Sequence, residues 1–161
     1  RRWLRESEGR LTRRLGALAD AGVTMRGGVS HPELQGFLRT CGVWTYPHAP
    51  RSPVETFCIS AAKALACGVW PVTTDNGALP EICFDGRILS TESLATEGGR
   101  ARYVEAVVDA MNERISPKWG KLDAAARARL HREALRRYDW DIGAKQISDV
   151  LRECAADREA A

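Results

Sequence analysis

The sequence lacks a hydrophobic run long enough to cross a bilayer, so it predicts no membrane span. It also has no internal repeat and no low-complexity linker, and its 161 residues suffice for one well-buried domain but not for two ordinary ones. No secretory signal is visible, although the chain opens with RRWL and without a methionine. We therefore expect a single domain over residues 1–161 and a cytoplasmic protein.

Metal-binding and disulfide patterns are missing as well. The chain has five cysteines and three histidines, and their spacing matches no paired metal-ligand motif. The cysteines lie in apolar surroundings, which favours small buried hydrophobic residues in a reducing compartment. We expect no metal site. The residues in question are Cys41, Cys58, Cys67, Cys83 and Cys154, with His31, His48 and His131.

Charge of one sign is scarce, since the net charge is only +3. The arginines gather near both ends of the chain, but Glu, Asp and Ala are interleaved with them, which is typical of solvated helix faces. No aromatic interleaving and no nucleic-acid recognition motif accompanies them. We expect no nucleic-acid partner, and a basic DNA- or RNA-binding domain is the least favoured hypothesis.

Short β-branched and aromatic runs alternate with helical patterns along the chain. The runs predict strands, and the last of them is expected at an edge of the sheet: 23–25, 43–46, 70–74 and 87–89. Helical periodicity, capping residues and terminal glycines predict helices at 3–19, 58–67, 79–83, 102–115, 120–138 and 141–153. A further helix is predicted to begin at a capping box formed by Ser30 and Glu33.

This alternation predicts an α/β fold, a Rossmann-like parallel sheet with helices on both faces. Such a sheet normally begins with a strand whose following loop helps to hold a ligand. Here a helix comes first, so we expect a partial domain that lacks its first strand or strands and ends in the helices of residues 100–156.

The segment from Glu55 to Ser60 reads as a junction between a strand and a helix. The first backbone N–H groups of that helix, at 58–60, have no partner within it and would receive a diphosphate. The Glu55 carboxylate would accept hydrogen bonds from hydroxyls of an attached polyol, and Lys63 could meet the other end of such a ligand. The alternative is a surface acid and a solvated lysine.

Around this junction the sequence resembles retaining glycosyltransferases of family 4. Their signature pairs two glutamates across the start of a small-residue helix, which a glycine, Pro-Val and a glycine turn with Pro-Glu follow. The matching residues are Glu55, Ala64, Leu65, Ala66, Gly68, Pro71, Val72, Gly77 and Leu79-Pro80-Glu81, and the segment 22–47 matches the family's preceding pattern.

The resemblance implies a GT-B enzyme in which this chain is the C-terminal, donor-binding domain. It would be a hexosyl- or other glycosyltransferase that moves a sugar from a nucleotide-diphosphate sugar to an unknown acceptor with retention. The acceptor would lie on a missing N-terminal domain of the same protein. Catalysis would be electrostatic stabilisation of an oxocarbenium-like sugar and a departing diphosphate, with neither metal nor cofactor.

The resemblance also implies roles for residues. Glu55 would be the catalytic residue, placed against hydroxyls of the donor sugar. Thr56, Phe57, Cys58, Ile59 and Ser60, with Lys63, would bind the donor sugar and diphosphate, and Arg26, Gly27 and Gly28 would lie near the nucleobase.

Two departures from the family matter for this hypothesis. Lys63 replaces the second glutamate of the signature, and a lysine cannot accept the ribose O–H hydrogens that a glutamate accepts. The loop that supplies the family's diphosphate-binding arginine and lysine would precede Arg1. We therefore expect this chain alone to bind donor poorly and to be inactive. The alternative is a noncatalytic nucleotide-binding or interaction module.

Other residues of the segment have structural explanations. Asp75 and Asn76 are typical of a turn, and Gly77 of a backbone requirement. Cys58 could be a nucleophile at a helix start, but packing under the loop is the favoured interpretation, since no catalytic His or Asn stands at a recognisable position.

Overall fold

The computed structural model describes residues 2–50, 53–115 and 120–159. Two compact units make up the chain, Arg1–Leu34 and Gln35–Ala161, and each is described by itself. Within the described ranges, no helix has both the length and the apolar character that a membrane span requires.

The first unit is helical. Helix α1 covers Arg2–Gly16 and the 3-10 turn η1 covers Ala19–Ala21, after which Gly22 adopts a φ of 88°. The predicted helix at 3–19 therefore ends earlier than expected. The predicted strand at 23–25 is wrong, because the described part of this unit offers no neighbouring strand with which its backbone could pair.

The predicted capping box at the start of α2 (His31–Leu38) is confirmed. The Ser30 backbone N–H donates to Glu33 Oε2 at 2.8 Å, and the Glu33 N–H donates to Ser30 Oγ at 3.4 Å. The hydrogen bonds from the Ser30 side chain and backbone also lower the pKa of Glu33.

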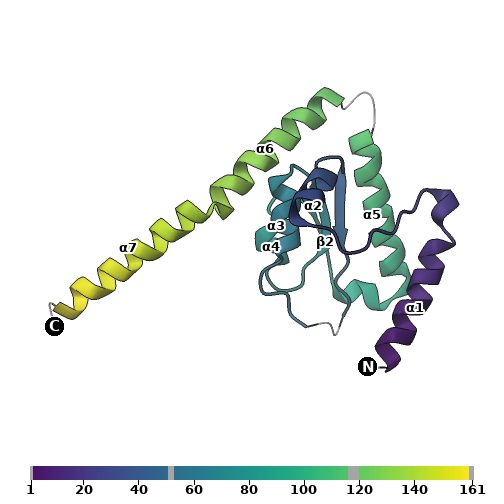
Figure 1. Ribbon diagram of the computed structural model, residues 1–161, viewed down its shortest axis with the longest axis horizontal. Helices are drawn as coiled ribbons and strands as arrows, with labels where there is room; N and C mark the ends of the chain where they lie inside the picture. The colour runs from purple at the N-terminus through teal and green to yellow at the C-terminus, as the bar shows by residue number, and fades with distance from the viewer. Residues whose placement is uncertain (1, 51–52, 116–119, 160–161) are drawn as a thin grey trace. The chain divides into compact units, whose positions relative to one another are not determined.

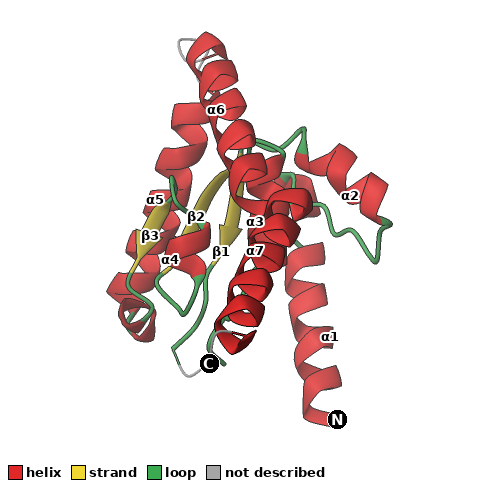
Figure 2. Ribbon diagram, turned by 90° about the vertical axis from the view of Figure 1, so that its left-hand side faces the viewer, coloured by secondary structure: helices red, strands yellow, loops and turns green. Residues whose placement is uncertain are grey.

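An open sheet of three parallel strands forms the centre of the second unit (Figure 2). The strands are β1 (Val43–Tyr46), β2 (Trp70–Thr74) and β3 (Arg87–Leu89), in the order β1-β2-β3. In the register, Val43 pairs with Trp70 and Val72 pairs with Arg87. These three strands have the predicted bounds, and β3 lies at an edge as expected.

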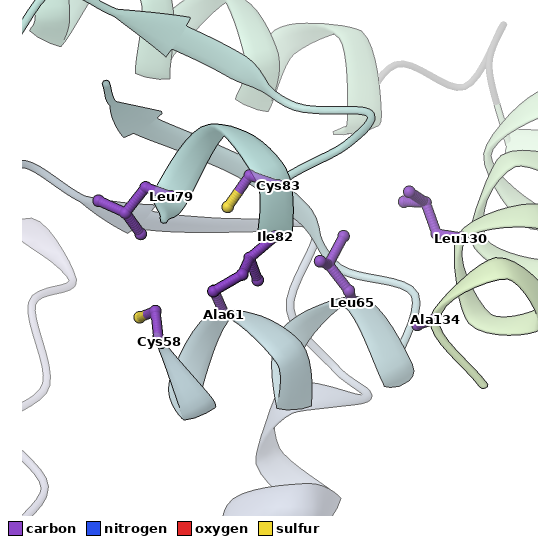
Figure 3. Packing of buried hydrophobic residues seen from close by; sticks show 8 residues of the cluster. All are labelled: Cys58, Ala61, Leu65, Leu79, Ile82, Cys83, Leu130 and Ala134. Carbon is purple, nitrogen blue, oxygen red and sulfur yellow. The ribbon is translucent and has the colours of Figure 1, made fainter. Parts of the chain in front are cut away.

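Helices cover both faces of this sheet, as predicted (Figure 1). On one face, Tyr103 and Ala110 of α5 (Glu97–Ile115) pack with Val72. The other face carries α3 (Ile59–Ala66), α4 (Leu79–Ile82) and α6 (Gly120–Tyr138). Their shared core contains Ala61, Leu65, Leu79, Ile82 and Leu130, with Cys58, Cys83 and Ala134 (Figure 3).

Helix α5 begins five positions before its predicted start at residue 102. The Thr96 hydroxyl accepts a hydrogen bond from the Gly99 N–H at 3.0 Å, which is the geometry of an N-cap. The glycine pair at 98–99 lowers the helix propensity of this turn, so the pattern alone placed the start too late. The 3-10 turn η2 (Glu92–Ala95) precedes it, and α7 (Trp140–Glu159) follows α6.

Helix α6 closes the C-terminal end of α3. The Arg127 guanidinium donates to the carbonyl oxygens of Cys41 at 2.7 Å, Arg39 at 2.7 Å and Cys67 at 3.4 Å. His131 Nδ1 lies 2.6 Å from the Ala66 carbonyl oxygen, to which it donates. Gly68 ends the helix with a φ of 70°, as its predicted capping role requires.

Candidate functional site

The candidate site lies at the edge of the sheet where β1 and β2 end, because parallel strands share their carboxyl edge. There the chain beyond β1 is attached to the end of β2. The His48 backbone N–H donates to Thr74 Oγ1 at 3.1 Å, and the Thr74 hydroxyl lies 3.4 Å from the His48 carbonyl oxygen. Since Thr74 is fully buried, this attachment fixes the backbone at His48.

The loop that carries Glu55 is attached to the turn after β2. The Glu55 backbone N–H donates to Asn76 Oδ1 at 2.7 Å, and the Ala78 N–H donates to the Glu55 carbonyl oxygen at 2.8 Å. Gly77 lies between these two bonds with a φ of 54°, and a Cβ there would stand 2.1 Å from the Glu55 carbonyl oxygen. Only glycine permits this close approach.

Asp75 holds the other side of the same turn. Its Oδ1 accepts the Thr91 backbone N–H at 2.6 Å, and its own N–H donates to the Leu89 carbonyl oxygen at 2.9 Å. The hydrogen bond from the Thr91 backbone N–H lowers the pKa of Asp75. Asp75 therefore links the turn to the chain beyond β3, and the loop geometry explains it without a ligand.

The N-terminus of α3 follows the Glu55 loop directly. The helix begins at Ile59 with Cys58 as its N-cap, one position after the predicted start. Among the described residues, we find no hydrogen bond from the backbone N–H groups of 57–60. Phe57 and Ile59 are 52% and 60% exposed. Cys58 is buried, so the exposed residues Phe57, Ile59 and Ser60 offer the N–H groups that a ligand could reach at the positive end of the helix.

Cys58 differs from its neighbours because its side chain is buried in the core beneath the helix start. Its Sγ lies 3.2 Å from Ser60 Oγ. In the same core, burial raises the pKa of Cys83 to about 12, and the charge of the nearby Cys58 thiolate contributes to this rise. Packing under the loop, the favoured sequence interpretation, agrees with this burial.

Aromatic residues line the same corner. The rings of Tyr46 and His48 meet edge to face with centroids 5.5 Å apart, and those of Phe57 and Tyr138 do so at 6.1 Å. Burial raises the pKa of Tyr46, and the charge of Glu55 raises it further.

The remaining predicted residues are less constrained. Thr56 and Ser60 are exposed beside the helix start, and Lys63 is half-buried on α3. The segment 26–28 is exposed and belongs to the first unit, so its role near a nucleobase stays a prediction.

Sequence reasoning treated Asn76 only as a turn residue and did not identify it as the anchor of the Glu55 loop. The hydrogen bond between them spans 21 positions, and the sequence carries no local signal for it. Among the residues that the structure describes, no group of three or more His, Cys, Asp or Glu side chains could hold a metal ion.

Comparison with known proteins gives one match. A family model described as "Glycosyl transferases group 1" matches residues 5–113, which include β1, the Glu55 loop, α3, β2 and β3. Neither the curated proteins nor the solved structures gave a match.

Proposed function

The chain belongs to the glycosyl transferases of group 1, and we propose that it forms the donor site of a retaining enzyme of the GT-B type. The donor is a nucleotide-diphosphate sugar. The acceptor would be bound by a further domain of the same protein, as the resemblance to family 4 implies.

One observation carries this proposal: the Glu55 loop is attached to the turn after β2, directly before the open N-terminus of α3. This arrangement supports a diphosphate on the N–H groups of 57–60 and a sugar whose hydroxyls donate to the Glu55 carboxylate. The N–H groups and the helix dipole would stabilise the departing diphosphate as its charge develops.

The test is titration of the protein with UDP-glucose, GDP-mannose, UDP and GDP, in which binding is measured by calorimetry or NMR. Glu55→Gln keeps the shape of the side chain and removes its charge. We expect it to weaken binding of the sugar nucleotide by roughly 10- to 100-fold, since a hydrogen bond to a charged group contributes about 1.5–3 kcal/mol. Binding of the parent diphosphate should change less, because the proposal assigns Glu55 to the sugar.

Glu105→Gln is the matched control, because Glu105 is an exposed acid on α5, which covers the opposite face of the sheet from α3. It should bind like the wild type. If Glu55→Gln binds sugar nucleotides as tightly as this control does, Glu55 has no role in donor recognition and the assignment of the site is wrong.

Lys63 favours a second candidate function, a noncatalytic nucleotide-binding module. A lysine in place of the second signature glutamate removes an acceptor for ribose hydroxyls and leaves a cation that can contact phosphate. Nucleotide binding without transfer and without donor hydrolysis, in the protein complete with its acceptor-binding domain, would favour this module. Turnover there would favour the transferase.

A further inference from the structure

His48 carries a buried nitrogen that the proposed donor site does not use. Among the described residues, its Nδ1 is sealed from solvent and has no hydrogen-bond partner. The ring is half-buried and packs edge to face on Tyr46. The Thr74 hydroxyl contacts both the backbone N–H and the carbonyl oxygen of His48. The ring is therefore held in place with one nitrogen buried and unpaired.

The buried, unpaired Nδ1 bears on which tautomer of the neutral ring is favoured. A buried N–H group without an acceptor is rarer and costlier in proteins than a buried acceptor without a donor. In the neutral ring this favours the tautomer with the proton on Nε2 and the lone pair on Nδ1. In that tautomer His48 has a single N–H donor, and the residue lies at the carboxyl edge of the sheet.

That donor belongs to the same corner as Glu55. Thr74, which holds His48, and Asn76, which holds Glu55, are two positions apart, so their Cα atoms are at most about 7 Å apart. Tyr46 contacts the His48 ring, and the charge of Glu55 contributes to the raised pKa of Tyr46. The backbones of His48 and Glu55 are thus attached to neighbouring positions at the end of β2.

We propose that His48 is a specificity-determining residue that donates its Nε2–H to an oxygen of the bound sugar nucleotide. This inference rests on the proposed function, because it concerns the same donor. A sugar hydroxyl would donate to Glu55, and an oxygen on the sugar or the diphosphate would accept from His48. The two residues together would thus recognise one hydrogen-bond donor and one acceptor of the ligand. An N–H donor is directional, which favours correct orientation of the ligand.

The first test measures the tautomer in the free protein. Long-range ¹H–¹⁵N correlation spectra, recorded at a pH where the ring is neutral, should show His48 with the proton on Nε2 and a lone pair on Nδ1. A neutral ring with its proton on Nδ1 would overturn the inference whether or not the protein binds a nucleotide.

The second test compares three substitutions by NMR titration with UDP-glucose and GDP-mannose. His48→Gln carries an amide near the position of Nε2, whereas His48→Asn carries one near Nδ1 and His48→Ala carries none. We expect the Ala and Asn variants to lose about tenfold or more in affinity for the sugar nucleotide that the wild type binds, and the Gln variant to recover most of it.

His131→Gln is the matched control, since His131 lies on α6 at the other end of α3. This substitution should leave the affinity for sugar nucleotides unchanged. Equal affinity of wild type and His48→Ala would overturn the role of His48 and leave the proposed function standing. Rescue by Asn in place of Gln would also overturn it, because it assigns the contact to Nδ1. Failure of the wild type to bind any of these ligands would overturn the proposed function and this inference together.

Discussion

At its C-terminal end, α3 is closed by side chains of α6, whereas its N-terminal end lies open beside the carboxyl ends of β1 and β2. The closed end presents carbonyl oxygens. Arg127 donates to those of Cys41 and Cys67, and His131 donates to that of Ala66. At the open end, the N–H groups of 57–60 have no such partners among the described residues.

This difference separates stability from binding within one short helix. Cationic and N–H donors at a helix C-terminus complement its dipole and stabilise the fold. An unfilled N-terminus contributes nothing of this kind until an anion occupies it. Substitutions at the closed end should therefore change stability, and those at the open end should change binding.

The largest effect is expected from Gly68→Ala at the closed end. Gly68 has a φ of 70°, and a Cβ there would stand 2.8 Å from the Arg127 carbonyl oxygen, which belongs to a helix and cannot move freely. Left-handed strain and this contact should lower the free energy of unfolding by about 2–4 kcal/mol, measured by urea denaturation.

Gly143→Ala is the matched control for that substitution. Gly143 lies in α7, and nothing stands within 4 Å of a Cβ built there, so alanine should leave stability unchanged or raise it slightly. If Gly68→Ala were as stable as this variant, α6 would not close α3 as described.

At the open end, Gly77→Ala should cost less stability and more affinity. Its Cβ would collide with the Glu55 carbonyl oxygen, but that oxygen lies in a loop that can shift. We expect a loss of about 1–3 kcal/mol, together with at least tenfold weaker binding of sugar nucleotides, because Glu55 leaves the turn. Weaker stability with unchanged affinity would contradict the division between the two ends.

The sequence predicted local features of both ends and missed the contacts that join them. Gly68, Gly77 and the Ser30/Glu33 box were predictable, because caps and turns depend on neighbouring residues. The strands at 43–46, 70–74 and 87–89 were predictable from short runs bounded by turn residues.

Long-range bonds carry no comparable signal. Arg127 reads as a solvated helix arginine in the sequence, yet it donates to carbonyl oxygens 60 to 88 positions away. The strand predicted at 23–25 had a suitable pattern, but a strand also needs a partner, and the pattern cannot supply one. The unpartnered nitrogen of His48 is likewise visible only in the folded chain.

The smallest effect tests the open end without a ligand. The pKa of Tyr46 is raised first by burial and then by the charge of Glu55, which disfavours the phenolate. Glu55→Gln removes that charge, so the Tyr46 pKa should fall but stay above its ordinary value, because burial is unchanged. NMR of ¹³Cζ-labelled tyrosine resolves Tyr46 from Tyr103 and Tyr138, whose pKa values burial also raises. Those two should keep their pKa values in the variant. An unchanged Tyr46 pKa would mean that the carboxylate points away from β1, and the corner that Glu55 shares with His48 would then not exist.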